Sequence, residues 1–505
     1  MPKFYIEAIE HARVYDVAKE TPLELAPKLS ARLHNEILLK REDLQPVFSF
    51  KLRGAYNKIV HLNESERQNG VICASAGNHA QGVALSAKKL GIAATIVMPR
   101  TTPEIKVKAV ESYGAIVVLF GDSYSDASSH ASELCQQTGM TYIHPYDDPL
   151  VIAGQGTIAA EILRQAPTDL DYIFVPIGGG GLIAGIAVYL KTITPNTRII
   201  GVEPIDSAAM HDSIKADERI TLKQVGIFAD GVAVKKVGEH TFDLVRKYVD
   251  DIILVDTDEI CAAIKDIYDE DRSIVEPAGA LAVAGMKKYI RQHPLRGKVI
   301  ACINSGANMN FDRLRHVAER SEMGERREAL FAVTIDENPG SFLTFCKLLG
   351  DRPITEFNYR LSGRNQAHVF VGIGISSEQE RQDIQALLEE HQYPVIDLID
   401  LIDNEVAKLH MRHMVGGKST DVQNEQLYRF EFPERPAALL DFLSCIAGRW
   451  NISLFHYRNH GAAFGRVLVG IEIPEQDQQA FEGFLMTLGY TWVNESDNPA
   501  LKLFL

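Results

Sequence analysis

Lys51 lies between two aromatic residues and ahead of a glycine, in the stretch PVFSFKLRGA at residues 46–55. A lysine amine becomes a nucleophile or a general base when burial suppresses its charge, and Phe48 and Phe50 fit such shielding from water. Gly54 is expected to mark a turn. Because an isolated lysine is most often a solvated surface residue, a catalytic role for Lys51 depends on the rest of the chain.

A loop of four glycines follows a predicted strand and begins a predicted helix. Backbone N–H groups in such a loop converge on an anion, and the helix N-terminus adds a partial positive charge. The spacing matches neither the phosphate loop of nucleotide hydrolases nor the GxGxxG pattern of dinucleotide-binding proteins. A phosphate cradle is therefore predicted, with a flexible turn as the alternative, at Gly178, Gly179, Gly180 and Gly181, followed by Leu182.

A second loop, SAGN, also joins a predicted strand to a predicted helix. Its residues are Ser75, Ala76, Gly77 and Asn78. Ser75 is expected to be the helix N-cap, and the free N–H groups of the first helical turn would bind a carboxylate. The Asn78 amide can donate to a phenolate-like oxygen. In the alternative interpretation these side chains only cap and pack, and His79 is expected to be structural.

Ser305 follows the apolar strand predicted at residues 298–303. Its hydroxyl would project from the carboxyl end of that strand, where it can bond a heterocyclic nitrogen. A lysine, a phosphate cradle, an amide donor, a carboxylate-binding helix start and this hydroxyl form the set of groups that pyridoxal phosphate requires.

The elements that position these loops alternate between strands and helices from about residue 50 to 310. Examples are the strand at 71–74, the helix Asn78–Leu90 closed by Gly91, and the strand at 172–177. Such alternation predicts parallel sheets covered by helices, with ligands at the carboxyl ends of the strands. Residues 173–190 carry no charge, but their glycines and proline argue against a membrane-spanning helix.

Composition describes an ordinary globular protein. The chain has 505 residues, 46% of them hydrophobic, and a formal net charge of −15 from 52 basic and 67 acidic residues. Without a basic cluster, binding to nucleic acid or to a membrane is not expected. The six scattered cysteines indicate reduced thiols, and the N-terminus lacks a signal sequence, so a cytoplasmic location is expected.

The last third of the chain contains an internal repeat. Three segments recur at offsets of 97, 98 and 98 residues, which indicates two copies of one small βαββα module. A charged linker precedes them. The predicted organisation is a catalytic region at 1–320 with a smaller subdomain at about 50–150, a linker at 321–328, and regulatory domains at 329–415 and 426–505.

The motifs SFKLRGA, SAGNHAQG, GGGGL and SGAN resemble those of the fold-type II, tryptophan-synthase-β-like enzymes that use pyridoxal phosphate. The resemblance implies that Lys51 forms the Schiff base with the cofactor and then acts as general base. It also implies that residues 178–182 hold the phosphate, that Asn78 meets the ring hydroxyl and that Ser305 faces the ring nitrogen. The SAGN loop would bind the substrate carboxylate.

The two repeats resemble the paired ACT-like domains of the biosynthetic threonine dehydratases. This resemblance implies deamination of L-threonine, and of L-serine, to 2-oxobutanoate or its serine counterpart and ammonia, at the first committed step of isoleucine synthesis. It further implies a homotetramer, inhibition by isoleucine and relief by valine. Candidate effector-binding residues are Phe342, Leu439 and Tyr457, which are equally compatible with a core role.

Some features stay open at the level of sequence. A catabolic serine/threonine dehydratase or a serine racemase would carry the same four motifs, and a sensor without catalysis is a further alternative. Relatives bind a metal at a loop resembling residues 201–209, but Ala209 replaces one of the acids, so Glu203 is expected to be a packed strand-end residue and no metal is predicted. Arg53 is expected to be structural. Glu276 lies in a family motif without an assigned role.

Overall fold

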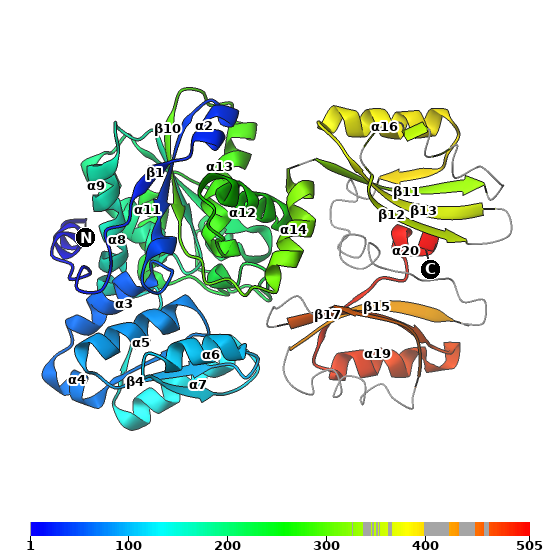
Figure 1. Cartoon of the computed structure of the whole chain (residues 1–505). Coiled ribbons are helices and arrows are strands. Elements are labelled where there is room, and N and C mark those ends of the chain that lie inside the picture. Colours follow the sequence, from blue (N-terminus) through cyan, green and yellow to red (C-terminus); the bar gives the residue numbers. More distant parts are fainter. Residues whose placement is uncertain are drawn as a thin grey trace. The chain divides into compact units, whose positions relative to one another are not determined.

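The computed structural model describes residues 2–325, 327–336, 345, 348–349, 352, 354–361, 366–397, 424–433, 450–458 and 464–504. They belong to two compact units, Met1–Ser321 and Glu322–Leu505 (Figure 1). Each unit has its own sheets and its own hydrophobic cores.

A six-stranded sheet forms the larger layer of the first unit. The antiparallel edge strand β1 pairs with β2, and all other neighbours pair in parallel. Ile173 and Val175 of β7 face one core while Phe174 faces the other, so both faces of the sheet are buried. In sheet order the strands are β1 (Leu23–Leu25), β2 (Glu36–Arg41), β10 (Val299–Asn304), β7 (Tyr172–Pro176), β8 (Arg198–Pro204) and β9 (Asp251–Val255).

Helices cover both faces of this sheet, as expected for a parallel sheet. One core contains residues of α1 (Pro2–Glu10), α8 (Pro149–Gln165), α9 (Gly181–Ile193) and α11 (Glu239–Tyr248). The other core contains residues of α2 (Pro27–Leu33), α12 (Thr257–Asp271) and α13 (Pro277–Gln292). The remaining helices are η1 (Glu42–Leu44), η2 (Ile205–Ser207), α10 (Ala209–Ala216), η3 (Asp230–Val232) and α14 (Arg313–Gly324).

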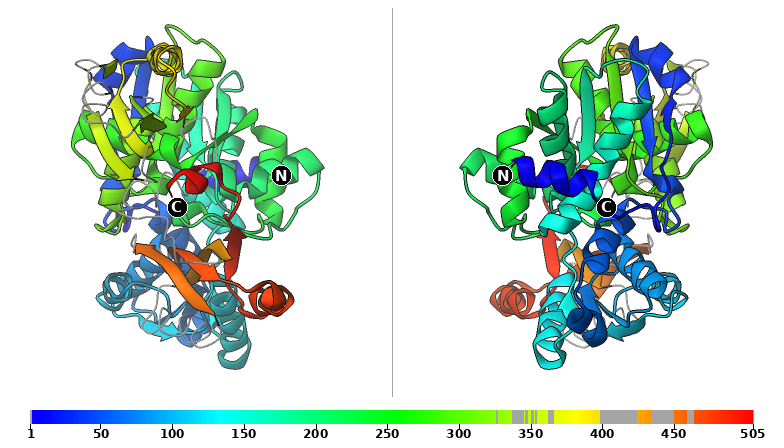
Figure 2. Two further views of the ribbon diagram at one scale, coloured as in Figure 1. Left: turned by 90° about the vertical axis from the view of Figure 1, so that its right-hand side faces the viewer. Right: turned by 90° about the vertical axis from the view of Figure 1, so that its left-hand side faces the viewer.

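A second, four-stranded parallel sheet forms the smaller layer of this unit, shown in blue and cyan beneath the larger one in both views of Figure 2. Its strands, in sheet order, are β5 (Ile116–Leu119), β4 (Ala94–Met98), β3 (Val71–Ala74) and β6 (Thr141–Tyr142). Its helices are α3 (Lys51–Val60), α4 (Glu64–Asn69), α5 (Asn78–Leu90), α6 (Glu104–Glu111) and α7 (Tyr124–Thr138). The predicted helix Asn78–Leu90 is confirmed, and it ends at Gly91 with a φ of +67°.

The expectation of a turn at Gly54 is wrong, because Gly54 lies inside α3. A Cβ on Gly54 would lie 2.4 Å from Nε2 of Gln155 and 2.7 Å from the carbonyl oxygen of Val151. The glycine is therefore required for the close approach of α3 to α8. The helix that begins with Lys51 is thereby fixed against a buried helix of the larger layer.

The second unit contains two four-stranded antiparallel sheets that repeat the same plan. Phe331 pairs with Val371 in the first sheet and Tyr428 pairs with Val469 in the second, at the offsets of 97 and 98 residues found in the sequence. A register shift recurs at equivalent places in β12 and β16. The first sheet contains, in order, β12 (Ile354–Leu361), β13 (Gln366–Gly374), β11 (Glu328–Asp336) and β14 (Val395–Asp397).

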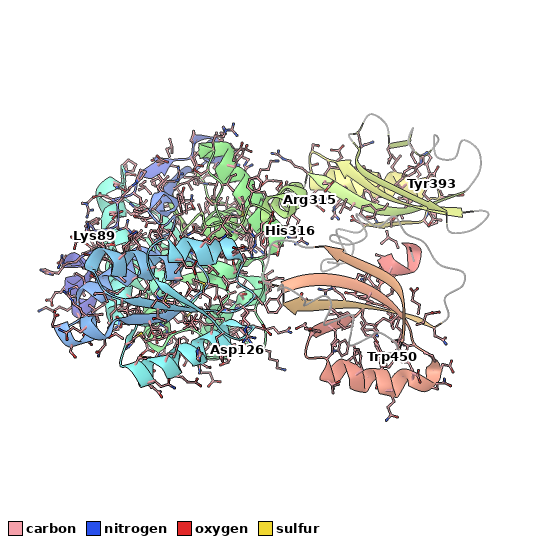
Figure 3. All side chains as sticks on the ribbon, turned by 60° about the horizontal axis from the view of Figure 1, so that its bottom comes forward. Lys89, Asp126, Arg315, His316, Tyr393 and Trp450 are labelled. Carbon is pink, nitrogen blue, oxygen red and sulfur yellow. The ribbon has the colours of Figure 1, made fainter. Side chains whose placement is uncertain are left out.

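The second sheet contains β16 (Asn451–Arg458), β17 (Phe464–Glu472), β15 (Glu425–Pro433) and β18 (Thr491–Asn494). Helices of this unit with described bounds include α16 (Glu378–Glu390), η5 (Glu475–Asp477), α19 (Gln478–Thr487) and α20 (Pro499–Phe504). Trp450, labelled in Figure 3, packs on Phe481 and Phe484 of α19 with ring centroids 4.8 and 5.2 Å apart. Each of the two sheets has a fourth strand, β14 or β18, which the predicted βαββα pattern does not contain.

Two further features bear on the predictions. The segment 321–328, predicted as a linker, contains the end of α14 and the beginning of β11 at Glu328. The uncharged run 173–190 divides into β7, the glycine loop and α9, as predicted. Within the described part of the chain, none of the helices has the length and apolar character that crossing a bilayer requires.

Candidate active site

The amino end of α3 carries Lys51 to the carboxyl end of β10, an interior strand of the larger sheet. Ser49 and Gly306 form an isolated antiparallel bridge. The N–H of Phe50 donates to the carbonyl oxygen of Ser305 over 3.3 Å. Lys51 therefore lies at the end of a parallel sheet where ligands bind.

The Lys51 amine is held in an environment that disfavours its charge. Nζ donates to the carbonyl oxygen of Pro145 over 3.0 Å. Burial lowers the pKa of Lys51 to about 8, and the carboxylate of Glu276 works in the opposite direction. Phe50 is buried with its ring centroid 5.4 Å from Nζ, whereas Phe48 is 55% exposed at a φ of +54°. Phe50 therefore lies where shielding was expected, whereas Phe48 is too exposed to shield the amine.

The four-glycine loop, Gly178–Gly181, connects β7 to the start of α9. Gly180 is the N-cap at a φ of +93°, which favours glycine. A Cβ on Gly179 would lie 2.2 Å from ring atoms of Tyr146, and one on Gly181 would lie 3.0 Å from the Tyr146 backbone. Side chains are thus excluded from the loop, which leaves its backbone N–H groups open to an anion.

The segment His144–Tyr146 links the lysine to the four-glycine loop. Pro145 accepts the Lys51 hydrogen bond, and Tyr146 packs on the loop glycines. The Tyr146 hydroxyl donates to the carbonyl oxygen of Lys236 over 3.1 Å. Leu182 is 4% exposed and belongs to the core, so only its backbone can serve a phosphate. Sequence reasoning missed Tyr146 because nothing in its local pattern indicates the loop it packs on.

The SAGN loop joins β3 to α5, but its cap differs from the prediction. Gly77, not Ser75, is the N-cap of α5. The hydroxyl oxygen of Ser75 accepts from the N–H of Gly77 over 3.2 Å, two residues before the position from which a side chain caps the helix. Ala76 completes the loop, and Asn78 is the first residue of α5. The first-turn N–H groups of α5 therefore have no side-chain cap and remain suited to a carboxylate.

Asn78 lies in a chain of side-chain hydrogen bonds. Its Nδ2 donates to Oε1 of Glu276 over 2.5 Å, and its Oδ1 accepts from Nδ2 of Asn308 over 2.6 Å. Nδ2 of Asn308 also donates to the carbonyl oxygen of Val47 over 2.7 Å. Glu276 and Asn308 are site residues that sequence reasoning did not assign; the SGAN motif contains Asn308, which is the signal that could have pointed to it.

Ser305 lies just beyond β10, as predicted, and is 3% exposed. Its hydroxyl donates to the carbonyl oxygen of Ala278 over 3.2 Å. Its backbone carbonyl holds Phe50, next to Lys51. The structure therefore brings Lys51, Asn78, Ser305 and the four-glycine loop to one end of the larger sheet, while their roles stay predictions.

Two neighbouring residues have the structural roles expected of them. His79 is buried, its Nε2 contacts the carbonyl oxygen of Ile143 over 2.8 Å, and burial with the nearby Lys51 lowers its pKa to about 3. It is therefore neutral. Arg53 is fully buried and forms ion pairs with Glu42 and Glu161.

Glu203 is the packed strand-end residue that was expected. Its Oε1 accepts from the N–H of Met210 over 2.9 Å and its Oε2 from the N–H of His211 over 2.7 Å. Burial raises its pKa to about 8. Ala209 begins α10. Over the described residues, no group of three or more His, Cys, Asp and Glu side chains is placed to hold a metal ion.

The candidate effector residues give no structural information. Phe342 and Leu439 lie outside the described residues, and Tyr457 lies on β16 without a described side chain. In the part of the chain that is described, Cys73, Cys135, Cys261 and Cys302 are reduced thiols, as predicted.

The residues present fit pyridoxal phosphate. In the four-glycine loop, at the N-terminus of α9, a Cβ at any of the four positions would collide with neighbouring protein atoms, so backbone alone is left to face an anion. An amine with a pKa of about 8 is suited to a covalent link with an aldehyde. An amide and a hydroxyl at the same sheet end can meet the polar atoms of the cofactor ring.

Comparison with known proteins agrees with this donor set. Residues 14–306 match the family described as "Pyridoxal-phosphate dependent enzyme". Residues 319–411 and 416–505 each match the "C-terminal regulatory domain of Threonine dehydratase". Both the catalytic unit and the internal repeat therefore have known counterparts.

Full-length relatives and solved structures extend these matches. The chain is 55% identical to "L-threonine dehydratase biosynthetic IlvA" of Burkholderia multivorans over 99% of both chains. It is 52% identical to the Escherichia coli protein of the same name over 99% of this chain and 97% of the relative. The processed threonine deaminase isoform 2 of Solanum lycopersicum aligns with a TM-score of 0.62 and 52% identity, over 63% of this chain and 93% of that one.

Maize serine racemase aligns at 34% identity with a TM-score of 0.59, over 64% of this chain and 98% of its own. A racemase thus shares one part of the chain, whereas the biosynthetic dehydratases share its whole length. This chain belongs to the biosynthetic threonine dehydratases, a family of pyridoxal-phosphate enzymes with C-terminal regulatory domains.

Proposed function

We propose that this chain converts L-threonine to 2-oxobutanoate and ammonia, and that it also accepts L-serine. The proposal rests on the buried Lys51 amine, with a pKa of about 8, which Pro145 and Tyr146 link to a loop in which only glycine fits. The choice of reaction is supported by 55% sequence identity to a biosynthetic threonine dehydratase over 99% of the chain.

The cofactor supplies the electron-withdrawing system that makes the α-hydrogen of the amino acid acidic. Lys51 would hold the cofactor through its Nζ until substrate arrives. Its released amine then takes the α-proton at Nζ, since burial keeps a large fraction of this amine neutral near pH 8. The β-hydroxyl leaves with a proton as water, and one water then adds to the resulting imine, which gives the 2-oxo acid and ammonia.

Other groups of the chain orient the reactants. The N–H groups of the four-glycine loop and of α9 bind the phosphate, and those of the SAGN loop bind the substrate carboxylate. Asn78 donates to the ring hydroxyl. Ser305 meets the ring nitrogen; since its one hydroxyl hydrogen is donated to Ala278, this hydroxyl must rotate in order to donate to the cofactor.

Regulation by amino acids is part of the proposal. Both repeats match a regulatory domain, and the ACT-like plan gives each a four-stranded sheet. Isoleucine is the expected inhibitor and valine the expected activator, with Phe342, Leu439 and Tyr457 as candidate contacts. A homotetramer in the cytoplasm completes the proposal.

The test measures 2-oxobutanoate formed from L-threonine by the full-length chain with pyridoxal phosphate, with and without isoleucine. Product that falls on addition of isoleucine and recovers with valine supports the proposal. No product, or D-amino acid as the main product, contradicts a dehydratase. Product that is indifferent to isoleucine contradicts the regulatory part alone.

A further inference from the structure

Glu276 is a buried carboxyl that the reaction outlined above does not use. It is 6% exposed and lies at the N-cap of α13, yet its side chain does not cap that helix. Its N–H donates to the carbonyl oxygen of Gly306 over 3.1 Å, and a Cβ on Gly306 would lie 2.7 Å from its Oε1. The carboxylate is thus wedged against the strand end that also carries Ser305.

The hydrogen bonds around Asn78 have a fixed direction. The carbonyl oxygen of Val47 can only accept, so the Asn308 amide must present its nitrogen there, at 2.7 Å. The same nitrogen donates to Oδ1 of Asn78 over 2.6 Å, which aims Nδ2 of Asn78 at Oε1 of Glu276 over 2.5 Å. A flipped Asn78 would place two nitrogen donors against each other and an oxygen against the carboxylate. One orientation therefore remains.

This orientation determines what Asn78 can offer a ligand. The Nδ2 group has two N–H donors, and the bond to Glu276 uses one of them. The second N–H keeps a direction set by Asn308 and Glu276 together. A donor fixed in this way loses little side-chain entropy when a ligand binds.

Glu276 also faces several charges. Its N–H bonds Gly306, which bridges to Ser49 two residues before Lys51, so Glu276 lies close to the start of α3. Its carboxylate raises the pKa of Lys51 against the effect of burial. Burial and the Asp230 carboxylate raise the pKa of Glu276 to about 7, while the bond from Asn78 and the cations Lys106 and Arg313 lower it. Asp230 is itself paired with Lys106 and Arg313 at 3.0 Å each. Above about pH 7, therefore, Glu276 carries a negative charge within the site.

We propose that Glu276 is a positioning residue with two separable effects: its oxygen fixes the Asn78 amide toward the cofactor, and its charge stabilises the positive charge at Lys51. This inference rests on the proposed function, because it assumes that the cofactor is linked to Lys51. Glu276 acts on the reaction through the orientation of Asn78 and through the electrostatic potential at Nζ of Lys51. It does not itself contact the reacting atoms.

Two variants separate the two effects. Glu276→Gln keeps an acceptor oxygen but removes the charge, so cofactor affinity is expected to stay near that of the wild type. The pH midpoint of the cofactor absorbance change is expected to move down by up to about 1 unit, the lower end of the effect of a nearby opposite charge. Asn308→Ala keeps the charge but frees the Asn78 amide. It is expected to weaken cofactor affinity about tenfold, the size of one lost hydrogen bond, with little change in the midpoint.

Glu203→Gln is the matched control. Glu203 is also a buried carboxyl at a strand end, but it accepts backbone N–H groups of α10 rather than a site amide. Its loss is expected to leave both the midpoint and the cofactor affinity unchanged.

The measurements are absorbance titrations with pH on full-length holoprotein and the cofactor affinity after resolution and titration with pyridoxal phosphate. An unchanged midpoint in Glu276→Gln overturns the charge effect, and an unchanged affinity in Asn308→Ala overturns the positioning effect, whether or not the other variant folds. The proposal is also overturned if Glu203→Gln shifts the pH midpoint as much as Glu276→Gln does. A wild-type chain that binds no pyridoxal phosphate overturns the proposed function together with this inference, whereas active wild type with unresponsive variants overturns this inference alone.

Discussion

Arg53 and Glu42 form a bidentate ion pair inside the catalytic unit. Nε of Arg53 donates to Oε2 of Glu42 and Nη2 donates to Oε1, each over 2.8 Å. Glu161 of α8 pairs with the same guanidinium and with Lys40 of β2. All four side chains are fully buried. The network therefore ties the helix that begins with Lys51 to the larger sheet and to α8.

Removing Arg53 should destabilise the catalytic unit strongly. In Arg53→Ala the two carboxylates lose a partner in a place without water, which costs about 3–5 kcal/mol of the free energy of unfolding. The loss in free energy of unfolding is measured by urea unfolding of the full chain, with a signal that reports on the catalytic unit. Arg246→Ala is the control, because Arg246 pairs with Asp217 on the surface at 2.9 Å, and its loss should change stability by less than about 1 kcal/mol. Equal losses in the two variants would refute a structural role of the network.

A methyl group on Gly179 should impair cofactor binding. In Gly179→Ala the new Cβ would meet the Tyr146 ring at 2.2 Å, so either the ring or the four-glycine loop must move. Cofactor affinity is expected to fall at least tenfold, as measured by titration of the resolved protein with pyridoxal phosphate. Gly483→Ala, where nothing lies within 4 Å of a Cβ, should leave the affinity unchanged. An unaffected Gly179→Ala would show that the loop does not hold the phosphate.

Glu203 should make stability depend on pH. Its pKa is raised by burial from 4.5 to about 8, so between these values the unfolded chain is ionised while the folded chain keeps its proton. The contribution of Glu203 to stability is therefore fully present below about pH 4.5 and is lost as the pH rises through 8. From about pH 5.5 to about pH 8.5, the wild type should lose more stability than Glu203→Gln, by an amount on the order of a few kcal/mol.

Thermal and urea unfolding at the two pH values measure this difference between the proteins. Changes shared by both proteins come from other groups and cancel in the comparison. Parallel losses in the wild type and in Glu203→Gln would mean that Glu203 ionises in the folded chain as it does in water.

The sequence was sufficient for the parts of the site that are local. The four-glycine loop and Ser305 follow β7 and β10, whose carboxyl ends meet at one edge of the larger sheet, and the SAGN loop follows β3 of the smaller sheet. The internal repeat was equally readable, because both copies keep the same strand register.

What the sequence could not show depends on contacts between distant segments. Glu161 meets Arg53 across 108 residues and Asn78 meets Glu276 across 198 residues, so no local pattern pairs them. Gly54 looks like a turn signal until α8 is packed against it. The strands β14 and β18 have only three and four residues, too few for an alternating pattern to be recognised.

The covalent link of the cofactor to Lys51 can be tested directly. The full-length holoprotein is reduced with borohydride, and the trapped pyridoxyl group is located by peptide mass spectrometry. Lys51→Ala, treated in the same way, is the control and should trap no cofactor on this segment. We expect a single pyridoxyl group on Nζ of Lys51, the amine with a pKa of about 8 that donates to Pro145. Trapping on another lysine, or no trapping in a protein that contains bound cofactor, would contradict it.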